Sequence, residues 1–160
     1  MPNSCDETNT AITLPQISKN NLFWNIREID MSDEIKVNGK CHCGEIEIEA
    51  VVQKSEVRAC HCTDCQKMSG APLRAIAVAP ANRTKIKGQP KEYIKIGDSG
   101  NKRIQAFCPD CGTQLFATDL QKAFYNLRVG LLEQRAELVP KQHVFTQSSV
   151  PWVEKLFSDT

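Results

Sequence analysis

The sequence has no long apolar run and almost no excess of charge of either sign. Its longest apolar stretch, residues 75–81, contains Pro80, whereas a membrane-spanning helix needs about 20 apolar residues. Lysine and arginine number 20 against 19 acidic residues, and the two signs are interleaved along the chain. Proteins that bind nucleic acid usually carry a clustered basic surface. We therefore expect neither a membrane span nor a nucleic-acid partner.

The beginning of the chain also lacks the pattern of a secretory signal. Such signals start with basic residues and continue with an apolar segment, but Asp6 and Glu7 here precede any lysine. We therefore expect a cytoplasmic protein in a reducing compartment. Disulfides are rare there, so closely spaced cysteines are expected to bind metal or to take part in chemistry.

The length of 160 residues suits one ordinary domain. Residues 1–35 are rich in Asn, Thr, Ser and Asp and show no persistent period, which indicates a loosely ordered N-terminal extension. Residues 36–160 are expected to form the compact domain. No repeat or low-complexity block interrupts it, and no pattern specifies an oligomeric state.

Short strands dominate the pattern of the expected domain. Between residues 45 and 52, Ile46, Ile48, Ala50 and Val52 alternate with glutamates, as in a strand with one buried face. Helical signal is limited to a turn after Cys62 and to residues 151–157, where Pro151 suits the first helical position. Further strands are expected at 74–79, 92–96, 103–107, 114–118 and 125–129. The chain is therefore predicted to be mainly β, with small antiparallel sheets and little helix.

Seven of the eight cysteines fall into three clusters, which are Cys41-His42-Cys43, Cys60-His61-Cys62-Thr63-Asp64-Cys65 and Cys108-Pro109-Asp110-Cys111. Two cysteines separated by one or two residues can direct both sulfurs to one tetrahedral zinc ion, at about 2.3 Å per sulfur. One such pair is a weak signal, but three within about seventy residues are a strong one.

Seven thiolates divide into one group of four and one group of three. Cys41 with Cys43 and Cys108 with Cys111 must meet to complete a tetrahedron, which predicts a closed, structural zinc site. Cys60, Cys62 and Cys65 come from one short loop and leave a fourth position for a substrate, as in catalytic zinc sites. The sequence thus predicts two zinc ions per chain, with the chemistry at the second.

Other assignments of the clusters stay open. His42, His61 or Cys5 could close the second site and make both zinc sites structural, although His61 is better explained as a supporting residue and Cys5 as a spare thiol. His143 is expected to be a surface or packing residue. An iron-sulfur cluster is less favoured because a ferredoxin-like run of four cysteines is missing. A redox role for Cys108 and Cys111 is weaker still, because no βαβ pattern surrounds them.

The segments GKCHCGEI, CHCTDCQKMSGAP and FCPDCGTQLF resemble those of the glutathione-dependent formaldehyde-activating enzyme family, which includes centromere protein V. The resemblance covers Val37 to the C-terminus, with Pro151 and Trp152 similar to the closing signature of the family. It implies sheets packed as a β-tent around zinc. It also implies a structural zinc on Cys41, Cys43, Cys108 and Cys111 and a catalytic zinc on Cys60, Cys62 and Cys65, in agreement with the count above.

The activity implied by this resemblance joins glutathione and formaldehyde to give S-hydroxymethylglutathione, and members are classed as carbon-sulfur lyases. The expected partner is thus a small-molecule thiol, glutathione in the first place. The alternative is a non-catalytic, zinc-stabilised binding module.

Four basic residues are candidates for the carboxylates of glutathione, although each is better explained as a solvated surface charge: Lys67, Arg74, Lys102 and Arg103. Asp64 is a candidate acid or base, but in such a turn an aspartate more often accepts backbone amides. After the SG pair the chain has Ala71, Pro72, Leu73 and Arg74, where many relatives show aromatic or small residues, which predicts a pocket of different shape and charge.

Overall fold

The computed structural model describes residues 32–96, 100–153 and 155. Within this part of the chain one α-helix accompanies ten strands and several short 3-10 turns, so the mainly β class is confirmed. The helix is α1 (Thr63–Ser69). The strands are β1 (Glu34–Lys40), β2 (Glu47–Gln53), β3 (Arg58–Cys60), β4 (Arg74–Pro80), β5 (Thr84–Lys87), β6 (Lys91–Ile96), β7 (Lys102–Phe107), β8 (Gln114–Thr118), β9 (Phe124–Arg128) and β10 (Gln142–Val144).

Each strand expected from the alternating pattern is present. In β2, Ile48, Ala50 and Val52 are buried while Glu47 and Glu49 are exposed, because successive side chains of a strand point to opposite faces. The turn expected after Cys62 is α1, and of the segment expected to be helical at 151–157 only residues 151–153 and 155 lie within the described residues. Strands β1, β3, β5 and β10 were not predicted.

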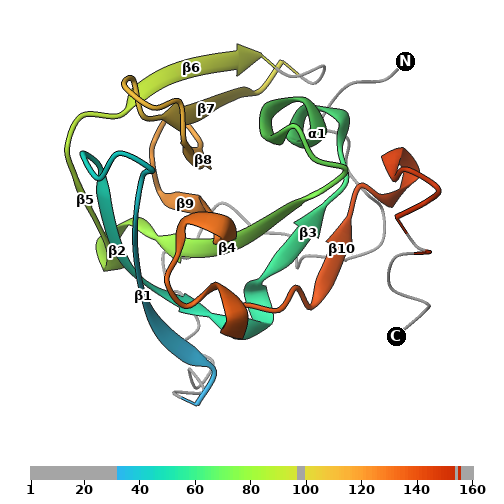
Figure 1. Cartoon of the computed structure of the whole chain (residues 1–160), viewed down its shortest axis with the longest axis horizontal. Helices are drawn as coiled ribbons and strands as arrows, with labels where there is room; N and C mark the ends of the chain where they lie inside the picture. The colour runs from blue at the N-terminus through green and yellow to red at the C-terminus, as the bar shows by residue number, and fades with distance from the viewer. Residues whose placement is uncertain (1–31, 97–99, 154, 156–160) are drawn as a thin grey trace, which may run out of the picture.

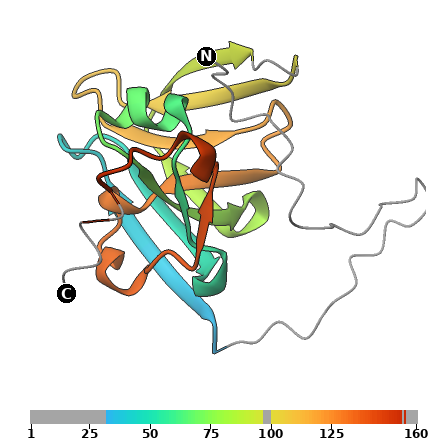
Figure 2. The ribbon, with the colours of Figure 1, turned by 90° about the vertical axis from the view of Figure 1, so that its right-hand side faces the viewer.

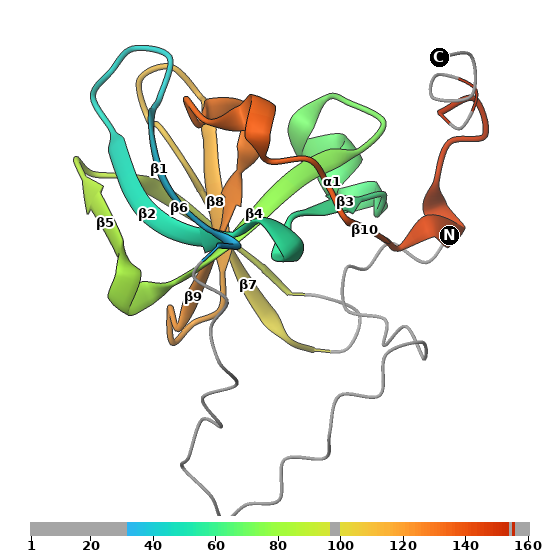
Figure 3. The ribbon, with the colours of Figure 1, turned by 90° about the horizontal axis from the view of Figure 1, so that it is seen from below.

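The strands form two sheets, shown in Figure 1. One has the order β1-β2-β5 and the other the order β10-β3-β4-β9-β8-β7-β6. All pairs are antiparallel except β10 with β3, which is parallel. In Figure 3 the smaller sheet lies on one side of the molecule, and β3, β10 and α1 lie on the other.

The core lies between the two sheets, where β2 packs against β4. Ala77 and Ala79 on β4 and Leu127 on β9 have no exposed surface, and they join Ile48 and Val52 of the smaller sheet in one apolar cluster. Burying these side chains supplies the main stabilisation of the domain. One face of the larger sheet is therefore occupied by the core, which leaves its other face for a site.

Helix α1 connects β3 to β4 on the side away from the smaller sheet, and Figure 2 looks onto this side. Its first turn is capped by Cys62, whose sulfur accepts a hydrogen bond from the backbone N–H of Cys65. It ends at Gly70, which has a left-handed backbone conformation with φ 64°. In the described part of the chain, no helix is both long and apolar enough to span a membrane.

Candidate metal centres

The turns after β1 and β7 bring four cysteines together from distant parts of the sequence. The sulfurs of Cys41, Cys43, Cys108 and Cys111 all lie within 4.8 Å of one another. The Sγ atoms of Cys41 and Cys43 are 3.4 Å apart, and those of Cys43 and Cys108 are 3.6 Å apart. Such a group of four soft donors matches the ligand set of a closed zinc site.

Tight turns shape this four-cysteine group. Gly44 and Gly112, each next to a cysteine, have φ values of 90° and 72°, a conformation that other residues rarely adopt. The backbone N–H of Ile46 donates to the Cys41 sulfur at 3.3 Å. The Thr113 hydroxyl lies 3.1 Å from the Cys111 sulfur, and its hydrogen bond, followed by that of the Thr113 amide, lowers the pKa of Cys111 to about 5. The thiolate form that a metal requires is therefore favoured at Cys111.

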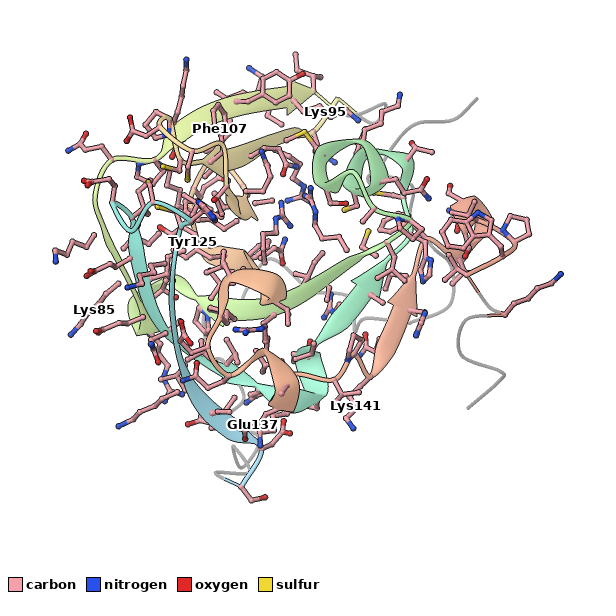
Figure 4. All side chains as sticks on the ribbon, viewed as in Figure 1. Lys85, Lys95, Phe107, Tyr125, Glu137 and Lys141 are labelled. Atoms are coloured by element: carbon pink, nitrogen blue, oxygen red, sulfur yellow. The ribbon has the colours of Figure 1, made fainter. Side chains whose placement is uncertain are left out.

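A second group consists of Cys60, Cys62 and Cys65, which surround the start of α1. Their sulfurs lie within 4.8 Å of one another, and the three residues are 3%, 2% and 7% exposed. Cys60 ends β3, Cys62 caps the helix, and Cys65 lies in the first turn. In Figure 4 the yellow sulfur atoms gather in two separate regions, one toward Phe107 and one beside α1. Each of the two groups could hold a metal ion.

Two buried arginines influence the charge of the three-cysteine group. Arg74 and Arg128 are only 5% and 7% exposed. The pKa of Cys65 falls to about 7, because its sulfur accepts a hydrogen bond from Cys60 and because both guanidinium groups favour a thiolate, although burial opposes the shift. The pKa of Cys60 is raised by the same hydrogen bond and by burial. The pair thus readily loses one proton near neutral pH.

His61 and His143 lie beside the three-cysteine group without joining it. Among the described residues no histidine or carboxylate belongs to either cysteine group. The His61 Nε2 atom is 2.9 Å from the His143 Nδ1 atom, and the two rings stack with centroids 5.1 Å apart. Burial, with a smaller contribution from His143, lowers the pKa of His61, so the ring is neutral at pH 7. Cys5 lies outside the described residues.

The structure corrects the expectation for one basic residue near this group. Arg74 was expected to be a solvated surface charge, and this is wrong, because the residue is only 5% exposed and lies opposite Cys60 on the larger sheet. Lys67 and Lys102 are exposed as expected. Asp64 pairs with the Lys95 Nζ atom of β6. Arg128 was not singled out from the sequence at all.

The family model described as glutathione-dependent formaldehyde-activating enzyme matches residues 36–148, more than half of the chain. The chain belongs to this family. The match spans both cysteine groups and all ten strands except the first residues of β1.

Two relatives illustrate how far the family likeness extends. The chain is 27% identical over 78 residues to an uncharacterized lyase of Schizosaccharomyces pombe. The aligned residues make up 49% of this chain and 54% of that protein. The match thus spans about half the length of that curated relative. A crystal structure of a Rhodobacter sphaeroides protein, solved as a structural genomics target, covers 67% of this chain and 99% of its own with a TM-score of 0.52. At 21% identity this likeness concerns the fold alone.

Proposed function

We propose that the protein is a zinc-dependent carbon-sulfur lyase, similar to S-hydroxymethylglutathione synthase, that acts on the adduct of glutathione or a similar thiol with formaldehyde. Cys41, Cys43, Cys108 and Cys111 would hold a structural zinc ion, and Cys60, Cys62 and Cys65 a catalytic one. The observation that carries this proposal is the difference between the two groups. One offers four sulfurs, whereas the other offers three, all buried around the start of α1.

The chemistry needs a nucleophilic sulfur at neutral pH. Zinc held by three cysteines would supply it by keeping a substrate thiol deprotonated. In the synthetic direction the thiol gives its proton to solvent and its sulfur forms a bond to the carbonyl carbon. The carbonyl π electrons move to the oxygen, which takes a proton from solvent. Cleavage of the adduct reverses each of these changes, so no oxidant or reductant is required.

Residues of the chain support this step in two ways. The burial of Cys60, Cys62 and Cys65 limits the access of water to the reacting sulfur. Arg74 and Arg128 place positive charge beside the group, which favours the binding of an anionic thiolate. A cytoplasmic location and the division into residues 1–35 and 36–160 stay predictions that accompany this function.

The proposal is tested by the metal content of the purified protein and by its response to thiols. We expect about two zinc ions per chain, one for each cysteine group. With cobalt in place of zinc, the thiolate-to-metal absorption bands should change as glutathione is added. One metal per chain, or two metals with spectra that no thiol alters, would favour a zinc-stabilised binding module instead.

A further inference from the structure

A cavity of about 530 Å³ is lined in part by Arg74, the direct strand partner of Cys60. Its walls come from the end of α1, the start of β4, the end of β9 and the turn after Cys111, and its lining includes Met68, Arg74, Gln114 and Arg128. This volume lies within the range of about 300–1,000 Å³ that is typical of small-ligand sites. The cavity is larger than formaldehyde needs, so other parts of a substrate can occupy it.

The register of the strands places both arginines on the face of the sheet that carries Cys60. Cys60 pairs with Arg74 between β3 and β4, and Ile76 pairs with Arg128 between β4 and β9. Directly opposite residues share a face, and so do residues two apart on one strand. Cys60, Arg74 and Arg128 therefore lie on one face, opposite the apolar core.

Three side-chain nitrogens of these arginines are buried without a hydrogen-bond partner. Nη1 and Nη2 of Arg74 are buried and make no hydrogen bond, and the same holds for Nε of Arg128. Nη2 of Arg128 donates to the Gln105 side-chain oxygen at 2.7 Å. Among the described residues no carboxylate pairs with either guanidinium, and the charges that favour their protonated forms are those of Cys60 and Cys65.

The cysteine sulfurs do not explain this arrangement fully. They attract the guanidinium groups electrostatically, but neither terminal nitrogen of Arg74 donates to a sulfur. A buried charge without hydrogen-bond partners is costly, and it is retained where a ligand compensates it. The planar fork of an arginine matches the two oxygens of a carboxylate.

We propose that Arg74 and Arg128 form a carboxylate-binding subsite in this cavity, so that the substrate at the three-cysteine group carries a carboxylate. The inference rests on the proposed function and narrows its substrate class. The carboxylate can belong to the thiol, as in glutathione, or to the carbonyl compound, as in glyoxylate. In both cases it is held on the same face of the sheet as the reacting sulfur.

The test uses the full-length, metal-loaded protein and two small thiols, mercaptoacetate and its methyl ester. Their dissociation constants are measured by calorimetry for the wild type, Arg74→Gln and Arg128→Gln. Each variant should lose about tenfold to hundredfold more affinity for mercaptoacetate than for the ester, the effect of losing a hydrogen bond to a charged group, because both thiols lose the positive charge beside the sulfurs but only mercaptoacetate carries the carboxylate. Each thiol is compared with itself across variants, so the different acidities of the two thiols cancel.

A second set of measurements tests whether the carboxylate belongs to the carbonyl compound rather than to the thiol. With the methyl ester as the thiol, glyoxylate and formaldehyde are compared as co-substrates. If neither thiol distinguishes the variants, but the preference for glyoxylate over formaldehyde falls at least tenfold in Arg74→Gln, the subsite serves the carbonyl compound. Lys85→Gln is the matched control, because it removes an exposed positive charge on β5, far from α1 in Figure 4. Lys85→Gln should leave both dissociation constants and the preference for glyoxylate over formaldehyde unchanged.

Two outcomes would overturn the subsite. Equal weakening of both thiols would mean that the arginines act only on the charge at the sulfurs, and no change in either arm would mean that they contact no substrate. The proposed function has its own readout, the cobalt spectrum. A spectrum that no thiol alters, with arginine-dependent binding of mercaptoacetate intact, would contradict the lyase and leave the carboxylate subsite standing. A variant that unfolds early in a thermal melt is replaced by Arg74→Lys, which keeps the charge but not the fork.

Discussion

Cys60 and Arg74 are directly opposite partners on β3 and β4, so a buried thiol and a buried guanidinium share one face of the larger sheet. The register that creates this pair also places Arg128 on that face, two strands from Cys60. Cys60 of the three-cysteine group and the positively charged wall of the cavity therefore have a common origin in three adjacent strands. Substitutions in the three-cysteine group should therefore alter the cavity wall, and substitutions in the wall should alter the three-cysteine group.

Replacement of a three-cysteine ligand should remove activity while preserving the fold. In Cys62→Ser we expect one zinc per chain in place of two and turnover below detection, because a hydroxyl is a poor zinc ligand. The core between the sheets does not involve Cys62, so circular dichroism should match that of the wild type. Retained activity would show that the catalytic centre has been assigned to the wrong cysteines.

Replacement of a four-cysteine ligand should have the opposite effect. Cys108 has no exposed surface and joins β7 to the turn after β1 through the shared group. Structural zinc contributes about 10–16 kcal/mol of apparent binding energy in small domains, as much as the whole stability of a typical one. Cys108→Ala should therefore give insoluble or unfolded protein, seen as a lost thermal transition. If the variant folds normally and loses only activity, the structural and catalytic roles are reversed.

The mainly β fold could be predicted because most strands alternate apolar and polar residues. Strand β2 is typical, with Ile48, Ala50 and Val52 on its buried face. Strands β3 and β10 were not predicted because each has only three residues, too few to show a period. Their parallel pairing places His143 against His61 across more than eighty residues, which no local pattern encodes.

The cysteine groups could be anticipated because spacing and ligand number restrict how thiols meet around zinc. The burial of Arg74 and Arg128 beside them could not be anticipated. Asn126 and Arg128 alternate with apolar residues in β9, a pattern typical of a solvent-exposed face. Arg128 is nevertheless only 7% exposed, and the tertiary packing that buries it is not visible in a strand period. A buried arginine is therefore indistinguishable from a surface arginine in the sequence alone.

A glycine in β1 should be required for packing. A Cβ atom at Gly39 would lie 2.3 Å from the backbone oxygen of Leu131, much closer than van der Waals contact allows. Gly39 also forms an isolated antiparallel β-bridge with Leu132, so β1 and the segment around Leu131 cannot separate easily. Gly39→Ala should lower the free energy of unfolding by about 1–3 kcal/mol, measured by urea denaturation. Gly130→Ala is the control, because its Cβ would meet nothing within 4 Å.

The pH dependence of thiol reactivity should report the charges around Cys65. In the metal-free protein, alkylation by iodoacetamide should include a step with a midpoint near pH 7, because the pKa of Cys65 is lowered to about 7. A lowered pKa means that the folded state favours the thiolate. Its contribution to stability is therefore complete above the ordinary thiol pKa of about 8.5 and is lost as the pH falls through about 7.

Two substitutions should move this midpoint in opposite directions. Arg74→Gln removes a charge that favours the thiolate and should raise the pKa of Cys65, whereas Asp64→Asn removes a charge that opposes it and should lower the pKa. The Asp64 carboxylate already pairs with Lys95, so Asp64→Asn should also change kcat only a few-fold, as expected for a residue that is not the general base. A loss of kcat above about a hundredfold with an unchanged fold would instead give Asp64 a role in proton transfer. An unchanged midpoint in both variants would mean that the hydrogen bond from Cys60, rather than these charges, sets the acidity of the thiol.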